Sequence, residues 1–171
     1  MSKGRLVRVP DAELVGSVDV DVVGGGQFPI YRVGAVREVG VFDEQLFFGF
    51  DDLEYGLRLR RAGFDVLADG DVWRPRRENR ATPYVGKTLT LGEPGWRRYY
   101  SVRNLIYILR RHHRTYAAAR LTLVLGLLKP LANVVASPRL SMRHLRLNTA
   151  AAWDAWTGRM GRRVEPGSDR F

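Results

Sequence analysis

The sequence predicts an α/β fold in which a partial layer of strands and helices is followed by a helical C-terminal extension. Three features predict it. Apolar and polar residues alternate over residues 18–23, as in a half-buried strand. Residues 51–63 begin with aspartates, carry arginines in their last turns and end in glycine, which is the charge and capping pattern of a helix. Beyond residue 95 the chain reads as successive helices interrupted by prolines.

The first half of the chain carries the expected strands. Glycines follow residue 23 and residue 39 and stand at residue 63, where they mark the ends of elements. The elements expected here are a strand at 18–23, a short extended segment at 27–31, a helix at 33–39, a helix at 53–63, and a strand at 64–68 with a continuation at 72–73. Two to four strands with the helix at 53–63 packed against them would form the layer.

The second half of the chain is expected to be helical. Prolines and glycines make residues 74–95 a predicted loop. Four helices are then expected, at 96–113, 116–128, 131–136 and 137–157, and residues 158–171 are a predicted loose tail. We therefore divide the chain into a first region, residues 1–95, and a basic helical region, residues 96–171.

Composition excludes several kinds of site. The 171 residues are 45% hydrophobic, as in a globular protein, and contain no cysteine. Disulfides, thiolate zinc sites and cysteine nucleophiles are therefore excluded. The histidines are His112, His113 and His144, and none adjoins a carboxylate in the sequence, so we expect no histidine-based metal site. We expect no secretory signal at residues 1–9, and the apolar stretch at 121–128 is shorter than the ~20 residues of a membrane crossing.

The charge is distributed unevenly along the chain. Residues 1–80 hold 12 Lys and Arg against 14 Asp and Glu, a net charge of −2, whereas residues 81–171 hold 16 against 4, a net charge of +12. A basic second half could meet nucleic acid, anionic lipid head groups or a phosphorylated substrate. It could equally be a solvated surface in an arginine-rich protein.

Two adjacent aspartates, Asp51 and Asp52, are the strongest candidates for chemistry. They open the predicted helix and follow the apolar residues Phe47, Phe48 and Phe50. Apolar surroundings disfavour an ionised carboxylate, whereas a helix N-terminus favours one. A general base for a hydroxyl must be ionised yet basic enough to accept a proton, and this balance suits that role. Aspartate is also a favoured N-cap of any helix, so the residues alone leave both interpretations open.

A longer pattern surrounds these aspartates. It consists of Gly24-Gly25-Gly26, Gly40-x-Phe42-Asp43-Glu44-x-Leu46-Phe47, Asp51-Asp52-x-Glu54, Arg58-Leu59-Arg60-x-Ala62-Gly63 and Tyr99-Tyr100-x-x-Arg103-Asn104. In residue type, order and spacing it resembles the acceptor-side half of family 2 inverting glycosyltransferases, including bacterial rhamnosyl- and galactofuranosyltransferase-like enzymes. The resemblance spans residues 24–104.

The resemblance implies a partial GT-A-like fold and an inverting transfer of sugar to a hydroxyl. Asp52 would be the catalytic base, and Asp51 and Glu54 would orient the acceptor or shape its pocket. The glycines at 24–26 would let the backbone approach the sugars closely, although they would equally make a plain turn. The chain would be the C-terminal portion of a longer enzyme, and therefore a truncated or incomplete form.

Two departures from the family pattern concern the donor. Complete enzymes of this family hold the donor diphosphate through Mg or Mn on a D-x-D motif. Asp19-Val20-Asp21 has these letters, but its 18 preceding residues are too few for a nucleotide-binding βαβ unit of about 30 or more, and both aspartates fit the polar face of a strand. The divalent metal is thus expected for the complete enzyme without ligands in this chain. Where relatives often carry a histidine that helps to hold the metal, this sequence has Trp73-Arg74. Either arginine neutralises the diphosphate here, since it pairs well with phosphate oxygens, or metal binding has been lost; on the first alternative Trp73 and Arg74 are substrate-binding.

The expected partners follow from the same pattern. They are a nucleotide-sugar donor, a glycan or lipid-linked acceptor such as a cell-envelope glycan, and a partner chain that carries the donor-binding half. Arginines lie among aromatic and aliphatic residues at 96–114, which suits a helix in a membrane interface as well as a helix packed within an enzyme. We expect a cytoplasmic location, with peripheral attachment to the inner membrane face as an option.

Two functions from different classes remain open at this stage. The first is a glycosyltransferase segment that is competent with a donor-binding half. The alternative is a non-catalytic basic protein that kept the scaffold and binds a membrane or another protein. Nucleic-acid binding is not expected, because no recognisable nucleic-acid-binding module accompanies the charge.

Overall fold

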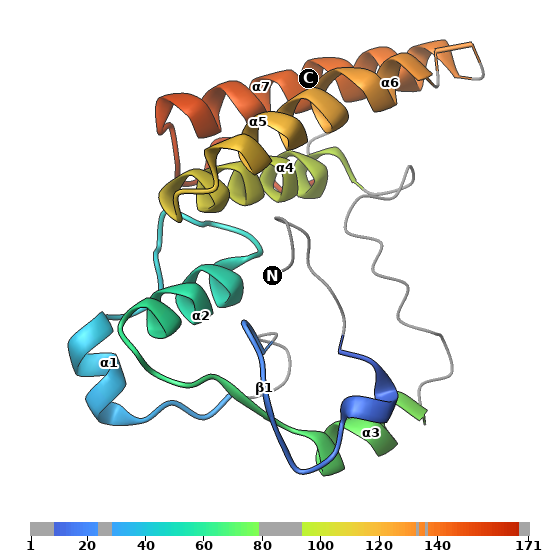
Figure 1. Ribbon diagram of the computed structural model, residues 1–171. Helices are drawn as coiled ribbons and strands as arrows, with labels where there is room; N and C mark the ends of the chain where they lie inside the picture. The colour runs from blue at the N-terminus through green and yellow to red at the C-terminus, as the bar shows by residue number, and fades with distance from the viewer. Residues whose placement is uncertain (1–8, 24–28, 79–93, 133, 136, 168–171) are drawn as a thin grey trace. The chain divides into compact units, whose positions relative to one another are not determined.

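The structure is a computed structural model that describes residues 9–23, 29–78, 94–132, 134–135 and 137–167. The described residues within 9–43 and 51–78 form a first unit, and those within 44–50 and 94–167 form a second (Figure 1). Of the described residues, 62% are helical and 4% lie in strands. The predicted α/β layer, and with it the partial GT-A-like fold, is therefore wrong for the described part of the chain.

Among the described residues of the first unit, two short strands pair as a sheet. β1, Ser17–Asp19, pairs antiparallel with β2, Leu67–Asp69, with Val18 opposite Ala68. The amide of Val20 adds one more bond, to the carbonyl oxygen of Val66 at 2.9 Å. The alternation over 18–23 predicted a longer strand. In this antiparallel register residues 21–23 would lie opposite residues 63–65, which follow the end of α2 and do not form a strand, so the described residues do not build a layer.

Asp69 ends the strand because its side chain starts a helix. Its carboxylate accepts hydrogen bonds from the amides of Asp71, at 3.0 Å, and Val72, at 3.1 Å, as a helix-capping residue does. The helix that follows, α3, is Gly70–Glu78. The predicted strand continuation at 72–73 is therefore wrong, as is a loop from residue 74 to 78.

Gly70 also ties this helix to the start of the chain. A Cβ at this position would lie 2.5 Å from the carbonyl carbon of Leu14 and from the amide nitrogen of Val15, so no side chain fits. The guanidinium of Arg77 bonds the carbonyl oxygen of Val9, at 2.7 Å, and the carboxylate of Asp11, at 2.8 Å. Asp11 opens η1, Asp11–Glu13, which is thereby held against α3.

Two helices of the first unit lie where the sequence predicted them. α1 is Val33–Val39, ended by Gly40 at φ 85°, and α2 is Asp51–Arg61, followed by Gly63 at φ 86°. Both glycines adopt the left-handed conformation that favours glycine. The small core between the two helices consists of Ala35, Tyr55 and Leu59, with Tyr31, Val39, Phe64 and Val66 packed against it.

The second unit is a bundle of helices. Its elements are α4, Gly95–Arg111; α5, Thr115–Leu123; the π-helical turn η3, Val124–Leu128; α6, Lys129–Ala132; and α7, Pro138–Thr157. α5, η3 and α6 run on without a break, and α7 packs along α4 and against η3 and α6 (Figure 1). The helices predicted at 96–113, 116–128 and 137–157 are thus confirmed, whereas the one predicted at 131–136 reduces to α6, and residues 133 and 136 lie outside the described residues.

α4 is the central helix of this bundle. Tyr99, Tyr100, Val102 and Ile106 are buried, and alanines of α7 let that helix approach closely. Arginine is buried here too: Arg98 is 3% exposed and Arg103 is 0% exposed. Of the two interpretations of residues 96–114, this burial supports packing within the protein. None of the helices in the described part of the chain has the length and hydropathy for a bilayer crossing.

The described part of the predicted loose tail is anchored. Gly158 ends α7 at φ 74°, and the chain then returns to α4. The hydroxyl of Tyr100 accepts hydrogen bonds from the amides of Arg163 and Val164, and donates one to the carbonyl oxygen of Val164, each at 2.9 Å. Val164 is 8% exposed. The expectation of a loose tail is therefore wrong for residues 158–164.

Candidate functional site

Asp52 lies in the first turn of α2 and on the wall of a cleft in the first unit. The cleft has a volume of about 460 Å³ and is lined by residues from α1, α2 and the segments that flank them. One carboxylate oxygen of Asp52 accepts a hydrogen bond from the amide of Leu53 at 2.7 Å. Asp52 is part-exposed and lines the cleft. Asp51 is exposed and is not among the residues that line it. Of the acidic pair, the second residue is thus the one that a molecule in the cleft would meet.

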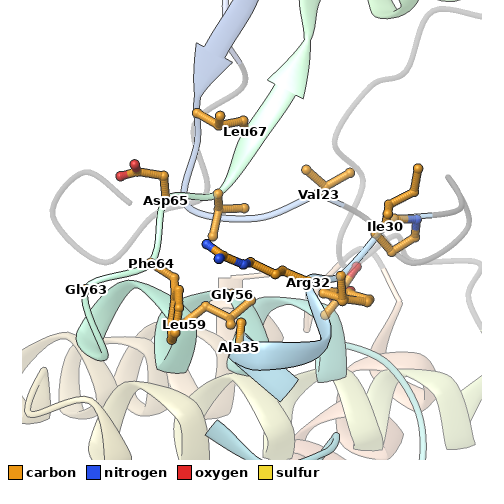
Figure 2. Close-up of a pocket in the computed structure, with 14 residues that line it drawn as sticks. Val23, Ile30, Arg32, Ala35, Gly56, Leu59, Gly63, Phe64, Asp65 and Leu67 are labelled. Atoms are coloured by element: carbon orange, nitrogen blue, oxygen red, sulfur yellow. The ribbon is translucent and has the colours of Figure 1, made fainter. Parts of the chain in front are cut away.

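The cleft brings together polar groups that are distant in the sequence. Tyr31 and Arg32 come from the segment before α1, and Asp65 comes from the segment after α2. Figure 2 shows the Arg32 side chain extended across the cleft and the Asp65 carboxylate directed away from it. The cleft therefore combines a carboxylate, a phenol and a guanidinium with an apolar lining, which is the make-up of a small-molecule site.

The phenol of Tyr31 is held in its protonated form. Burial raises the pKa of Tyr31, and the neighbouring Tyr55, Asp52 and Asp51 raise it further. The ring stands edge-on to Phe42 and Tyr55, with centroid distances of 5.8 and 5.2 Å. Packing on two sides restricts the ring's orientation, and the protonated hydroxyl remains a hydrogen-bond donor at neutral pH.

The floor of the cleft requires a glycine. Gly56 lies on α2 one turn beyond Asp52, and a Cβ there would lie 2.5 Å from the carbonyl oxygen of Asp21. The backbone of residues 21–22 therefore passes directly over the helix. Figure 2 shows Gly56 beside Leu59 and Ala35 at the base of the cleft. The close approach of the two backbones explains why residue 56 is a glycine.

Glu54 lies beneath this surface. Its side chain is 0% exposed and forms an ion pair at 2.8 Å with the guanidinium of Arg58, which lies one turn further along α2. Arg58 also donates to the carbonyl oxygens of Val39, at 2.9 Å, and Val41, at 2.7 Å. Contact between Glu54 and a bound acceptor would need a local rearrangement, so its role as an acceptor-orienting residue stays a prediction.

The segment that leads into α2, residues 44–50, belongs to the second unit and is anchored there. Asn104 donates hydrogen bonds to the carbonyl oxygens of Phe48, at 2.8 Å, and Gly49, at 3.0 Å. Arg103 donates to the carbonyl oxygen of Gln45 at 3.4 Å. Both residues are 0% exposed. The Arg103-Asn104 pair, which the sequence singled out only as a motif, thus holds the backbone immediately before Asp51-Asp52.

Aromatic contacts reinforce this anchor. The ring of Phe47 lies 5.0 Å from that of Tyr100, and the ring of Phe48 lies 4.8 Å from that of Trp96. Arg103 sits over Tyr100 at 4.7 Å. Burial lowers the pKa of Arg103. Burial also raises the pKa of Tyr99, and the hydrogen bond from the Tyr99 hydroxyl to Asp154 raises it further. Phe47 and Phe48, which precede the acidic pair in the sequence, therefore pack on α4.

The last two residues before α2 adopt a left-handed backbone conformation. Gly49 has φ 74° and Phe50 has φ 66°. A positive φ is uncommon for a bulky residue such as phenylalanine and stores strain, which the surrounding contacts must offset. Phe50 is covalently joined to Asp51, so the strained residue stands directly before the candidate acidic pair.

The other predicted site residues lie elsewhere or outside the described residues. Gly24, Gly25 and Gly26 fall outside them. Trp73 and Arg74 lie on α3, and Arg74 donates to the carbonyl oxygen of Asp11 at 3.3 and 3.0 Å. Neither residue is among those that line the cleft of Asp52. Their role toward a donor phosphate stays a prediction.

The D-x-D letters have a structural explanation. The carboxylate of Asp19 forms an ion pair with Arg60 of α2, through two hydrogen bonds, one of them at 2.9 Å. This agrees with the interpretation of Asp19 as the polar face of a strand. In the described ranges, no three Asp, Glu or His side chains gather as metal ligands would, so we assign no metal-binding residues and draw no step through a metal.

Sequence reasoning missed Tyr31 and Arg32 as neighbours of Asp52. Twenty residues or more separate them from it, and only the packing of α1 on α2 brings them to one cleft. The sequence carries one signal for them, since Tyr31 and Arg32 directly precede the helix predicted at 33–39 and follow the glycines at 24–26. Comparison with known protein families, with curated proteins and with solved structures gave no match to this chain.

Proposed function

We propose that this chain carries the acceptor-side catalytic site of an inverting glycosyltransferase, with Asp52 as the base. The observation that carries the proposal is the position of Asp52, in the first turn of α2 and on the wall of a cleft of about 460 Å³. A part-exposed carboxylate on the cleft wall is accessible to a bound hydroxyl, as a general base must be.

The reaction assigns a task to each group in the cleft. The Asp52 carboxylate takes the proton of an acceptor hydroxyl, whose oxygen forms a bond to the anomeric carbon of the donor sugar. The bond from that carbon to the phosphate oxygen breaks, and the nucleoside diphosphate leaves with the electron pair. The Tyr31 hydroxyl, protonated at neutral pH, donates a hydrogen bond to an acceptor oxygen, and Arg32 extends across the cleft, where it can bind an anionic group.

The remaining parts of the enzyme belong to the proposal as well. The nucleotide-sugar donor, with the divalent metal expected for such enzymes, would be bound by a further part of the protein or by a partner chain. The acceptor would be a glycan or a lipid-linked sugar at the cytoplasmic face of a membrane. The proposal rests on the arrangement around Asp52 and not on a GT-A-like layer, which the described residues do not form.

The proposal is tested in the organism from which the sequence comes. The gene is deleted and replaced by the wild-type, Asp52→Asn or Asp51→Asn form, and incorporation of labelled sugar from a panel of nucleotide sugars is measured in cell extracts. We expect the deletion to lose one incorporation activity, the wild-type and Asp51→Asn forms to restore it, and Asp52→Asn to fail. Full restoration by Asp52→Asn would refute the role of Asp52.

The same strains separate catalysis from the alternative function. A non-catalytic basic protein that binds a membrane or another protein would give an incorporation defect that Asp52→Asn repairs, or no defect at all. An immunoblot against residues 140–167 in the same extracts reports the level and the size of each variant. Equal protein levels make the comparison of the variants' incorporation activities valid. A product larger than the 19.4 kDa of this chain would leave room for the donor-binding part in the same polypeptide.

A further inference from the structure

The strongest feature outside the cleft is an apolar surface at the end of the bundle, where η3 and α6 turn back into α7. Among the described residues from 127 to 142, six large apolar side chains are exposed. They are Leu127, Leu128, Leu131, Val134, Val135 and Met142. We call them, together with the exposed Lys129 and Arg139, the hairpin-tip surface.

The hairpin-tip surface is an outward face of a folded hairpin. Leu125, Gly126, Pro130 and Ser141 in the same stretch are buried, so the hairpin has a distinct inner side. α6 and η3 both pack against α7, which fixes the two arms of the hairpin to each other. The outward apolar residues are therefore held in place. Val135, at the turn, is 93% exposed and Leu131 is 55% exposed, a large apolar area to leave in water.

The charge around this surface has one sign. From residue 94 to residue 153 the sequence contains no aspartate and no glutamate, while lysine and arginine recur throughout. Lys129 and Arg139 are exposed in the hairpin tip, and Arg120 and Arg146 are exposed further along α5 and α7. An apolar tip within an acid-free basic region matches a surface that is apolar inside and anionic at its face.

We propose that the hairpin-tip surface inserts into the interface of a bilayer that contains anionic lipid. Leu127, Leu131 and Val135 enter the boundary between head groups and acyl chains, and Lys129 and Arg139 contact lipid phosphates. This surface differs from residues 96–114, where the sequence suggested a membrane helix and the structure shows buried arginines and tyrosines. The inference does not rest on the proposed catalytic role of Asp52, because no residue of the hairpin tip lines that cleft.

The experiment is flotation of the purified chain with vesicles of phosphatidylcholine mixed with phosphatidylglycerol, compared with vesicles of phosphatidylcholine alone. We expect binding to the anionic vesicles, weaker binding to the neutral ones, and loss of the difference as salt is raised. Lys129→Gln with Arg139→Gln should weaken binding to anionic vesicles about 25-fold, because each basic residue contributes about fivefold, or ~1 kcal/mol, at such a surface. Leu131→Ser with Val135→Ser should weaken binding to both kinds of vesicle.

Matched variants in the first unit provide the controls. Arg37→Gln with Arg61→Gln removes the same charge, and Val15→Ser with Val72→Ser removes exposed valines, all outside the hairpin tip. We expect each control pair to bind vesicles within about threefold of wild type, since neither touches the surface. Circular dichroism of every variant reports whether it remains folded.

Three results would overturn the inference. The first is no binding of the wild-type chain to anionic vesicles. The second is equal weakening by the hairpin-tip and control pairs, which would reduce the effect to net charge. The third is a change of oligomeric state in Leu131→Ser with Val135→Ser without a change in vesicle binding. That result would assign the surface to a contact with a second copy of the chain.

Discussion

Asn104→Ala should release the segment that leads into the candidate acidic pair. The Asn104 side chain donates to the carbonyl oxygens of Phe48 and Gly49 and accepts from the Nε of Arg103 at 3.0 Å. A hydrogen bond of this kind contributes a net ~1 kcal/mol, so the loss of all three should cost about 3 kcal/mol of unfolding free energy. Two of the three hold residues 48–49, and their loss should make local opening of that segment about 30-fold more frequent, the equivalent of ~2 kcal/mol.

Asn148→Ala is the matched control. Asn148 is also 0% exposed and lies in the same unit. Its side chain accepts from Arg98 at 3.0 Å and donates to the carbonyl oxygen of Leu125, away from residues 44–50. This variant should lose about 2 kcal/mol of unfolding free energy without opening the segment.

The assay combines urea unfolding with limited proteolysis. Chymotrypsin cleavage after Phe47 and Phe48 is followed by mass spectrometry under native conditions, where the rate tracks the population of the open segment. Cleavage should accelerate about 30-fold in Asn104→Ala and remain near the wild-type rate in Asn148→Ala. Equal cleavage in the two variants would refute the conclusion that Asn104 anchors this segment.

Three further predictions concern packing, ion pairs and pH. Gly56→Ala should lower the unfolding free energy by about 1–2 kcal/mol in urea titrations, because overlap with the backbone oxygen of Asp21 outweighs the ~1 kcal/mol that alanine gains in a helix; a stabilised variant would contradict the close approach. Arg58→Ala should lower the unfolding free energy by about 3 kcal/mol, because it leaves buried Glu54 without this partner. Arg60→Ala should lower it by less than about 1 kcal/mol, because the pair of Arg60 with Asp19 is exposed. Similar losses of unfolding free energy in the two variants would contradict this ranking. Burial, together with the charges of Arg98 and Arg143, lowers the pKa of His144 in the folded chain. The unfolded chain therefore binds a proton at His144 more readily than the folded chain does. The folded state keeps its full stability above the unfolded pKa of about 6.5 and loses part of it as the pH falls below that value. His144→Gln should flatten the rise of thermal midpoint between about pH 5 and 7, and an unchanged rise would contradict this origin.

Helix positions were predictable where the sequence carries local punctuation. Gly40 and Gly63 mark the ends of α1 and α2 because both adopt a positive φ that other residues avoid. Gly158 does the same for α7. These signals act within a few residues, and they hold whatever the rest of the chain does.

The sheet was overpredicted because alternation reports a half-buried surface and not a partner. Residues 18–23 alternate as a strand would, but in the antiparallel register residues 21–23 would lie opposite residues 63–65, which follow α2 and do not form a strand. The Asp69-Gly70 pair was a visible helix-start signal that the prediction of a continuing strand overlooked.

The candidate site was predictable only in part. Asp52 stood out through its position before a helix, and the structure places it on a cleft. Its neighbours Tyr31 and Arg32 could not be found, because their proximity depends on how α1 packs against α2. The burial of Arg103 was equally hidden, since arginine is usually exposed and the carbonyl oxygens that satisfy it lie at residues 45 and 161.

The measurement that tests the central claim most directly is the rate of sugar transfer by the protein isolated from its native organism through a tag on this chain, in its wild-type, Asp52→Asn and Asp51→Asn forms. A general base contributes about 10²–10⁴-fold to a rate. We predict a loss of that size in kcat for Asp52→Asn, with unchanged donor KM, and a loss below about tenfold for Asp51→Asn, which lies outside the cleft lining. Equal kcat values for wild type and Asp52→Asn would contradict the account.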